Sequence, residues 1–155
     1  MPQSYVCLPI HVVFSTKKRI ALIQPEWEER LFAYTGGVLR NEKCVLLAAG
    51  GMPDHVHLLI SWAKEKSVAE VLRIIKTNSS KWIHETIPGQ GDFAWQAGYG
   101  AFAVSQSNVE QVKRYIANQK EHHRKMTFQE EFLAILKRHG IAYDERYVWN
   151  EEIVG

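Results

Sequence analysis

The chain has 155 residues, of which 46% are hydrophobic and 23% are charged, and its formal net charge is +2. These values predict one globular domain over residues 1–155 with a sizeable core. No apolar run approaches the ~20 residues of a membrane span, and no signal-peptide pattern opens the chain, so we expect a cytoplasmic protein with no membrane partner. The small net charge does not by itself indicate a nucleic-acid binder, and any basic surface must come from clustering.

The hydrophobic pattern predicts alternating strands and helices in the first two thirds of the chain. Residues 5–16 are rich in β-branched and aromatic residues and predict a strand, after which Pro25 opens a helix of about 15 residues. Residues 43–51 and 55–62 predict two strands of a hairpin around the turn Met52-Pro53-Asp54. Residues 68–86 have helical periodicity, and 93–105 alternate aromatic and small residues as in a fourth strand.

Two more helices are predicted after the fourth strand. The first runs from about 108 to 125, and the second begins at the capping pair Thr127 and Glu130 and ends at Gly140. The order strand, helix, strand, strand, helix, strand is the split βαβ, ferredoxin-like pattern. We therefore predict an α+β fold whose antiparallel sheet has its first and third strands in the centre. The two main helices cover one face, and the appended helix lies on the other.

Two histidines in the segment MPDHVHLLI (52–60) give the first chemical signal. His55 and His57 stand at i and i+2, so on a strand both imidazoles leave the same face of the sheet. Two neighbouring imidazoles suit a divalent metal, but the same residues could be polar groups on a half-buried strand. The pair alone leaves both interpretations open.

The predicted helix 108–125 carries Tyr115 and Gln119, which share a face because they stand at i and i+4. A tyrosine can act as a nucleophile that forms a covalent intermediate, and a metal on the histidines could polarise a phosphoryl oxygen for its attack. Gln119 could complete the coordination through its carbonyl oxygen. Either residue alone would be unremarkable, and it is their pairing with the histidines that indicates a site.

Clusters of basic residues indicate a polyanionic substrate. The candidate DNA-binding residues are Lys17, Lys18 and Arg19 after the first strand, and Lys113, Arg114, Lys120 and Arg124 on the tyrosine helix. The first group could instead be a solvated turn. Basic groups that follow phosphates, together with aromatic residues that stack bases, suit single-stranded nucleic acid. The candidate stacking residues are Phe93, Trp95, Tyr99 and Phe102, although Trp95 and Tyr99 could equally be core or dimer contacts.

Three further histidines are candidates for a supporting role. His122 and His123 follow Gln119 and could contact phosphate, support the site or cap the helix, and we predict support rather than metal ligation. His11 lies on the strand beside the histidine pair, where it could orient a metal ligand or be a core histidine.

Taken in order, these motifs resemble the IS200/IS605-type tyrosine transposases, single-tyrosine HUH endonucleases that include the REP-associated tyrosine transposases. The segments that carry the resemblance are HVVFSTKKR, MPDHVHLL, FAWQAGYGAFAVS and YIANQKEHH. The histidine pair alone is a weak signal, and the ordered set is a strong one.

The resemblance implies a substrate, a mechanism, a metal and an oligomeric state. Such enzymes cut single-stranded DNA beside a hairpin, where the position matching Tyr115 attacks the scissile phosphate and forms a 5′-phosphotyrosine with a free 3′-hydroxyl. The 3′-hydroxyl of a second strand then attacks that linkage and joins the strands. The metal is Mg²⁺ or Mn²⁺ on the positions matching His55, His57 and Gln119. The enzyme is a homodimer, in which the tyrosine helix can complete the site of the partner subunit. Two imidazoles by themselves suit Mn²⁺ better than Mg²⁺.

Three alternative functions remain. The chain could be a catalytically inactive or domesticated protein that binds hairpin DNA. A ferredoxin-like sheet with aromatic residues is also the architecture of RNA-recognition domains, although these carry aromatics where His55 and His57 stand. A metal-dependent phosphoesterase is less favoured, because it would need further ligands and would not need Tyr115.

Overall fold

A four-stranded antiparallel sheet forms the centre of the computed structural model, which describes residues 3–149. The strand order is β2-β3-β1-β4, so the first and third strands are central, as predicted. The strands span Val45–Met52 (β2), His55–Ser61 (β3), Pro9–Ser15 (β1) and Gly100–Ala103 (β4). All three strand pairs are antiparallel, and the predicted ferredoxin-like α+β fold is confirmed.

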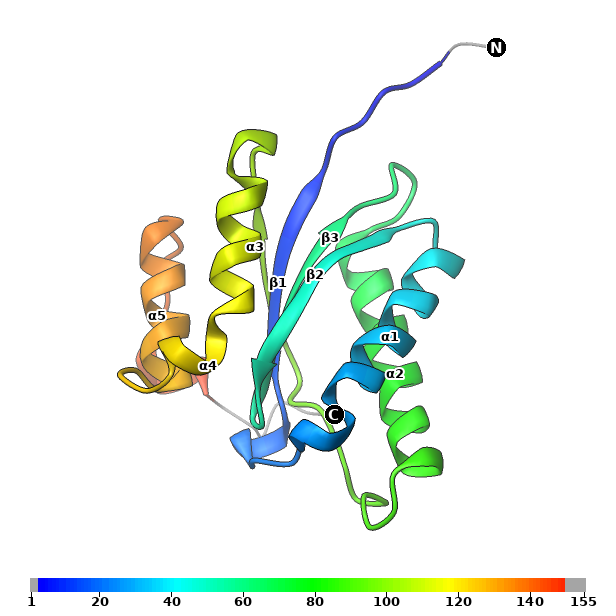
Figure 1. The fold of residues 1–155 in the computed structure, drawn as a ribbon. Helices are drawn as coiled ribbons and strands as arrows, with labels where there is room; N and C mark the ends of the chain where they lie inside the picture. The colour runs from blue at the N-terminus through cyan, green and yellow to red at the C-terminus, as the bar shows by residue number, and fades with distance from the viewer. Residues whose placement is uncertain (1–2, 150–155) are drawn as a thin grey trace.

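Helices α1 (Pro25–Asn41) and α2 (Val68–Thr86) cover one face of the sheet (Figure 1). Alternate residues of the two central strands point to this face, because side chains on a strand change sides at every residue. Val12, Val56 and Leu58 are among those that join the largest hydrophobic cluster with both helices. This layer holds most of the buried apolar surface and positions β1 and β3.

Helices α3 (Val109–Ala117), α4 (Gln119–His122) and α5 (Phe128–Arg138) lie on the opposite face (Figure 1). Two smaller clusters hold them there, one around Val13 and Phe102 with α5, and one around Leu59 with α3. The remaining short helices are η1 (Lys17–Arg19), η2 (Gln106–Asn108) and α6 (Glu145–Val148). Between residues 3 and 149, no helix combines the length and apolarity needed to cross a membrane.

Three predicted elements are shorter than expected. The strand predicted over 5–16 is wrong in extent, because β1 spans only Pro9–Ser15. The strand predicted over 93–105 is wrong in extent, because β4 spans only Gly100–Ala103 and the preceding segment makes a single bridge between Thr16 and Trp95. The indole of Trp95 packs against Phe14, with ring centroids 4.8 Å apart, and Gly98 turns the chain at a φ of +89°. Side-chain burial and this turn therefore hold the segment away from ladder pairing.

The helix predicted over 108–125 is also wrong in its continuity. Asn118 ends α3 with φ −97° and ψ 19°, outside the helical region, and α4 begins at the next residue. Asparagine favours such a position because its side chain competes with helical backbone bonds. The break lets Gln119 turn into the interior, where its side chain is buried.

Candidate metal and nucleophile site

The two histidines of β3 lie side by side and are fully buried, each with 0% exposure. They leave the sheet on the face covered by α3–α5, as the i, i+2 spacing predicts. The Nδ1 atom of His55 lies 2.7 Å from the Asp54 carboxylate, and that of His57 lies 2.8 Å from Nε2 of His11. These partners fix both rings, so that the Nε2 atoms turn toward the helices.

The side chain of Glu131, in the first turns of α5, lies at the centre of the site. Its Oε1 atom is 3.3 Å from Nε2 of His55, 3.0 Å from Nε2 of His57 and 2.9 Å from Nε2 of His123. Its Oε2 atom accepts hydrogen bonds from the Gln119 amide, at 2.9 Å, and from the Tyr115 hydroxyl. One carboxylate, 1% exposed, therefore joins the histidines to the candidate nucleophile.

Glu131 was not among the site residues predicted from the sequence, although the residues around it contain a signal. The capping box of Thr127 and Glu130 starts α5, and the helix then buries Phe128, Glu131 and Ile135. These three positions stand at the i, i+3, i+7 spacing of a core-facing stripe, where a carboxylate is unusual. A charged residue in an otherwise apolar stripe could have been read as a buried site residue.

Tyr115 and Gln119 both reach the histidines although the helix breaks between them. The Gln119 carbonyl oxygen lies 3.1 Å from Nε2 of His55, and its side chain is buried. The phenol ring of Tyr115 lies 5.7 Å from the ring of His57, measured between centroids. Burial and the Glu131 carboxylate raise the pKa of the Tyr115 hydroxyl, so the free phenol holds its proton at neutral pH.

The charges of the site are divided unevenly among its imidazoles. Burial alone would lower the pKa of His55, but hydrogen bonds to Asp54 and Glu131 outweigh it and raise that pKa to about 9. Burial lowers the pKa of His57, and burial together with the charge of His57 lowers that of His11 to about 3. Although burial opposes ionisation, the histidines and Tyr115 hold the pKa of Glu131 well below its usual range.

Four of these groups could hold a metal ion. One ligand atom each from His55, His57, His123 and Glu131 lies within 4.8 Å of the other three. Imidazoles with a carboxylate and an amide oxygen are donors suited to Mn²⁺ or Mg²⁺, and the residues therefore fit such an ion.

The predicted supporting histidines occupy different places. His11 contacts His57, and its buried ring also lies near Tyr115. His123 enters the group of possible metal ligands, and its Nδ1 lies 2.7 Å from the carbonyl oxygen of Met126. His122 is more exposed, with its Nε2 atom 3.9 Å from Oε2 of Glu131.

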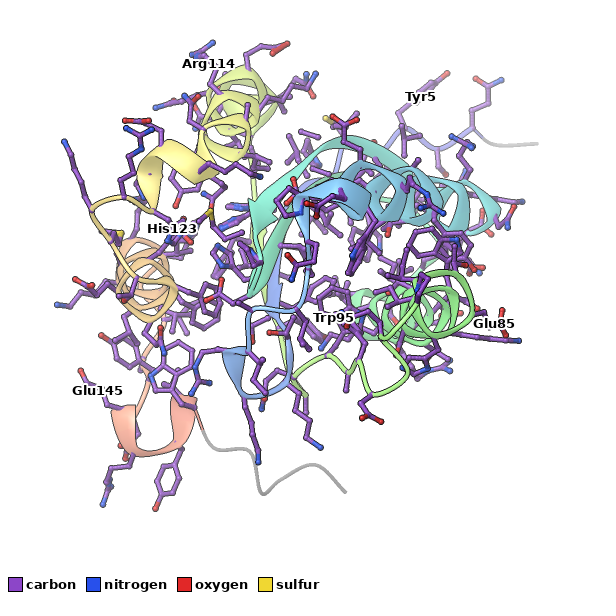
Figure 2. The ribbon with its side chains drawn as sticks, turned by 60° about the horizontal axis from the view of Figure 1, so that its bottom comes forward. Tyr5, Glu85, Trp95, Arg114, His123 and Glu145 are labelled. Atoms are coloured by element: carbon purple, nitrogen blue, oxygen red, sulfur yellow. The ribbon has the colours of Figure 1, made fainter. Side chains whose placement is uncertain are left out.

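The predicted DNA-binding residues lie around the site rather than in it. Lys17, Lys18 and Arg19 form the turn that follows β1. The last residue of β1, Ser15, pairs with His55, so this turn lies at the end of the sheet where His55 stands. On the helices, each of three cations pairs with a carboxylate: Lys113 with Glu110, Lys120 with Glu28, and Arg124 with Glu121. Figure 2 shows Arg114 projecting outward from α3.

The candidate stacking aromatics are split between the two faces of the sheet. Phe93 and Trp95 pack in the cluster beneath α1 and α2, away from the histidines, and Figure 2 shows Trp95 on the side opposite His123. Tyr99 is 40% exposed. Phe102 is buried on the face of the site, where its ring lies 6.3 Å from that of His11.

Comparison with known proteins places the chain in a family. The model of the family described as "Transposase IS200 like" matches residues 4–119. The ISDra2 transposase TnpA of Deinococcus radiodurans is 23% identical in an alignment of 117 residues that covers 72% of this chain and 84% of that protein.

Two solved structures have a similar fold. One is a Deinococcus radiodurans R1 protein described as a candidate transposase, with 25% identity and a TM-score of 0.61 over 77% of this chain and 96% of that one. The other is a REP-associated tyrosine transposase bound to a REP hairpin, with 15% identity and a TM-score of 0.58 over 79% of this chain and 73% of that one. The chain therefore belongs to the IS200-like transposase family, whose members are HUH-type tyrosine transposases that act on single-stranded DNA.

Proposed function

We propose that this protein cleaves and rejoins single-stranded DNA at hairpin-bearing ends, with Tyr115 as the nucleophile and a 5′-phosphotyrosine as the intermediate. The observation that carries the proposal is the shared Glu131 carboxylate, which contacts the Tyr115 hydroxyl with one oxygen and three imidazoles with the other. The nucleophile and the candidate metal ligands are therefore neighbours in one buried site, as metal-assisted phosphoryl transfer requires.

The metal would be Mg²⁺ or Mn²⁺, held by the predicted ligands His55, His57 and Gln119 together with His123 and Glu131. When bound, such an ion polarises a phosphoryl oxygen as a Lewis acid. The hydrogen bonds of His57 to His11 and of His55 to Asp54 orient the two rings for this task.

The Tyr115 oxygen attacks the scissile phosphorus, a new O–P bond forms, and the bond from phosphorus to the 3′-oxygen breaks. The Oε2 atom of Glu131 accepts the hydrogen bond from Tyr115 and is the atom placed to take its proton. The leaving 3′-oxygen becomes a hydroxyl by taking up a proton, which the protonated Glu131 carboxyl can return. In the joining step a 3′-hydroxyl of another strand attacks the same phosphorus, and Tyr115 recovers its proton.

The substrate and the assembly belong to the same proposal. The likeness in fold to a transposase bound to a REP hairpin supports hairpin-bearing DNA as the ligand. The cations of the 17–19 turn lie at the histidine end of the sheet, where they could contact phosphates beside the site. We further propose a cytoplasmic homodimer, and light scattering of the purified protein would measure its oligomeric state.

A cleavage assay tests the proposal. Hairpin oligonucleotides from the flanks of the gene are incubated with wild-type protein, Tyr115→Phe and the control Tyr34→Phe, each with Mn²⁺, Mg²⁺ or a chelator. Tyr34 stacks on Trp82, on the face away from the site, so its variant should behave as wild type. We expect a metal-dependent covalent adduct that Tyr115→Phe abolishes. Hairpin binding without an adduct would instead indicate an inactive binding protein, and cleavage by Tyr115→Phe would indicate a metal-activated water.

A further inference from the structure

A pocket of about 300 Å³ opens beside Tyr115, on the side away from the candidate metal ligands. It lies between the segment after β4, the first turns of α3 and the end of α5. Twelve residues line it, among them His11, Phe102 and Tyr115 together with Asn108, Gln111, Arg138 and His139. None of His55, His57, His123 and Glu131 contributes to its wall, so the pocket is separate from the metal cluster.

Tyr115 and His11 form the boundary between the two compartments. The two rings lie 6.1 Å apart, and each belongs to the pocket lining while His11 also contacts His57. A strand whose phosphate reaches the Tyr115 hydroxyl must continue past this boundary. The pocket is the hollow that a neighbouring nucleotide would meet.

The charge of the pocket suits a phosphate group. Arg138 is a permanent cation in its lining, and no Asp or Glu lines it. Among residues 3–149, no carboxylate forms an ion pair with Arg138. Burial and Glu131 raise the pKa of Tyr115, whereas the positive charge of Arg138 lowers it. The electrostatic field of Arg138 therefore reaches the Tyr115 hydroxyl. Arginine pairs with phosphate through two parallel N–H donors.

The neutral residues of the pocket suit a base. The amides of Asn108 and Gln111 each offer donors and an acceptor, and neither side chain forms a hydrogen bond within the described part of the chain. The exposed ring of His139 packs against the ring of Phe102, with centroids 4.7 Å apart, and forms an aromatic part of the pocket wall. Unpaired bases are commonly bound by such stacking and by amide contacts to their edges.

We propose that this pocket binds the single nucleotide of the DNA strand next to the scissile phosphate, with its phosphate on Arg138 and its base between His139 and the amides of Asn108 and Gln111. The volume lies at the lower end of the ~300–1,000 Å³ of small-molecule sites, which suits one nucleotide rather than several. The inference rests on the proposed cleavage function for its role, but the binding itself can be measured without cleavage.

The first test is a titration of the ¹⁵N-labelled full chain with dAMP, dCMP, dGMP, dTMP and inorganic phosphate. We expect saturable shifts of the Asn108 and Gln111 side-chain amides and of the Arg138 Nε–H with at least one nucleotide, and weaker binding of phosphate alone. Arg138→Gln should weaken nucleotide binding by roughly 10-fold or more, as expected for a lost hydrogen bond to a charged group. Gln111→Ala should weaken it less, and Arg73→Gln, on the exposed side of α2, should leave it unchanged.

The second test uses cleavage of the hairpin oligonucleotide. Arg138→Gln should raise KM by a similar factor while the Tyr115 adduct still forms. An abasic residue beside the scissile phosphate should keep that difference, because its phosphate remains, and should remove the smaller difference between wild type and Gln111→Ala. Nucleotide titrations without shifts at the pocket, or shifts that phosphate reproduces in full, would overturn the inference even if wild-type protein forms the adduct. Nucleotide binding at the pocket in a protein that forms no adduct would support the pocket and contradict the cleavage function.

Discussion

At the scale of single residues, Glu131 has the largest set of contacts in the site. An ionised carboxylate is costly to bury unless several donors compensate it. Here Tyr115, Gln119 and His123 are among the groups that do so. The same oxygen atoms that accept these bonds are available to a divalent ion. Glu131 therefore connects the candidate metal ligands to Tyr115, the proposed nucleophile.

Replacing Glu131 by Gln should reduce the affinity for Mn²⁺ by roughly 10-fold or more, because it removes the only negative charge of the candidate ligand set. Calorimetry or electron paramagnetic resonance of Mn²⁺ would measure the change. The matched control is Glu130→Gln, which keeps the capping box because glutamine serves there as well. Equal affinities of both variants and wild type would show that Glu131 does not bind the metal.

The pair of Asp54 and His55 should make the metal-free protein sensitive to alkaline pH. The pKa of His55 is about 9 in the folded chain and 6.5 for an unperturbed histidine, so its protonated form stabilises the fold below pH 6.5. This contribution, on the order of 3 kcal/mol, should be lost as pH rises from 6.5 to 9. Urea unfolding in a chelator would measure it.

Asp54→Asn should flatten that pH dependence, since it removes the first of the hydrogen-bonding partners that raise the pKa of His55. Asp92→Asn, on an exposed loop, should leave the dependence intact. If the free energy of unfolding changed with pH in the same way for wild type and Asp54→Asn, this carboxylate would not control the charge of His55.

At the scale of elements, the approach of α3 to β2 sets the position of Tyr115. Gly50 pairs with His57 across the sheet, and a Cβ atom at Gly50 would lie 2.4 Å from the carbonyl oxygen of Ile116. No real Cβ approaches a backbone oxygen this closely, so only glycine lets the helix pack at this depth. The residue before Ile116 is Tyr115, the proposed nucleophile.

Gly50→Ala should therefore push α3 away from the sheet, lower the free energy of unfolding by roughly 1–3 kcal/mol and reduce adduct formation. Gly37→Ala is the contrasting variant, because a Cβ there meets only the flexible end of Arg40 at 3.9 Å. On a helix that change should stabilise by about 0.5–1 kcal/mol. Denaturant unfolding would compare the two variants. A free energy of unfolding for Gly50→Ala equal to that of wild type would contradict the close packing of α3 on β2.

Sequence patterns predicted most elements but not all of their limits. The strand over His55–Ser61 and the order of the elements follow from alternation and capping signals, which are local. The irregular path of 94–99 depends on the burial of Trp95 and on a donor from Lys76, which are contacts between distant segments. The site residues also differ in how far they could be predicted. His55 and His57 belong to a local motif, whereas Glu131 reaches them only through tertiary packing. The family match, which ends at residue 119, also does not extend to Glu131.

At the scale of the whole molecule, one chain completes the site. Strand β3 supplies two histidines, α3 supplies Tyr115, α4 supplies Gln119 and α5 supplies Glu131. These elements enclose the site from one side of the sheet (Figure 1). The arrangement places the proposed nucleophile and the candidate metal ligands within the same subunit, and the expectation that residues 1–155 form one domain stays a prediction.

Mixing two inactive variants tests whether that arrangement is the active one. Tyr115→Phe lacks the nucleophile, and His57→Ala lacks a candidate metal ligand. If Tyr115 acts within its own chain, as its contact with Glu131 indicates, the mixture should remain inactive after subunit exchange. Recovery of adduct formation in the mixture would show that the tyrosine acts in the site of a partner subunit.

The central claim is that Tyr115 becomes covalently joined to DNA, and mass spectrometry of the adduct tests it most directly. Trypsin cleaves after Arg114 and Lys120, so the tyrosine lies in the short peptide YIANQK, residues 115–120. After nuclease digestion of the metal-dependent adduct, we predict this peptide with a nucleotide attached through a 5′-phosphate to Tyr115. Cleaved DNA with only unmodified peptide, or a nucleotide on a different residue, would contradict the mechanism.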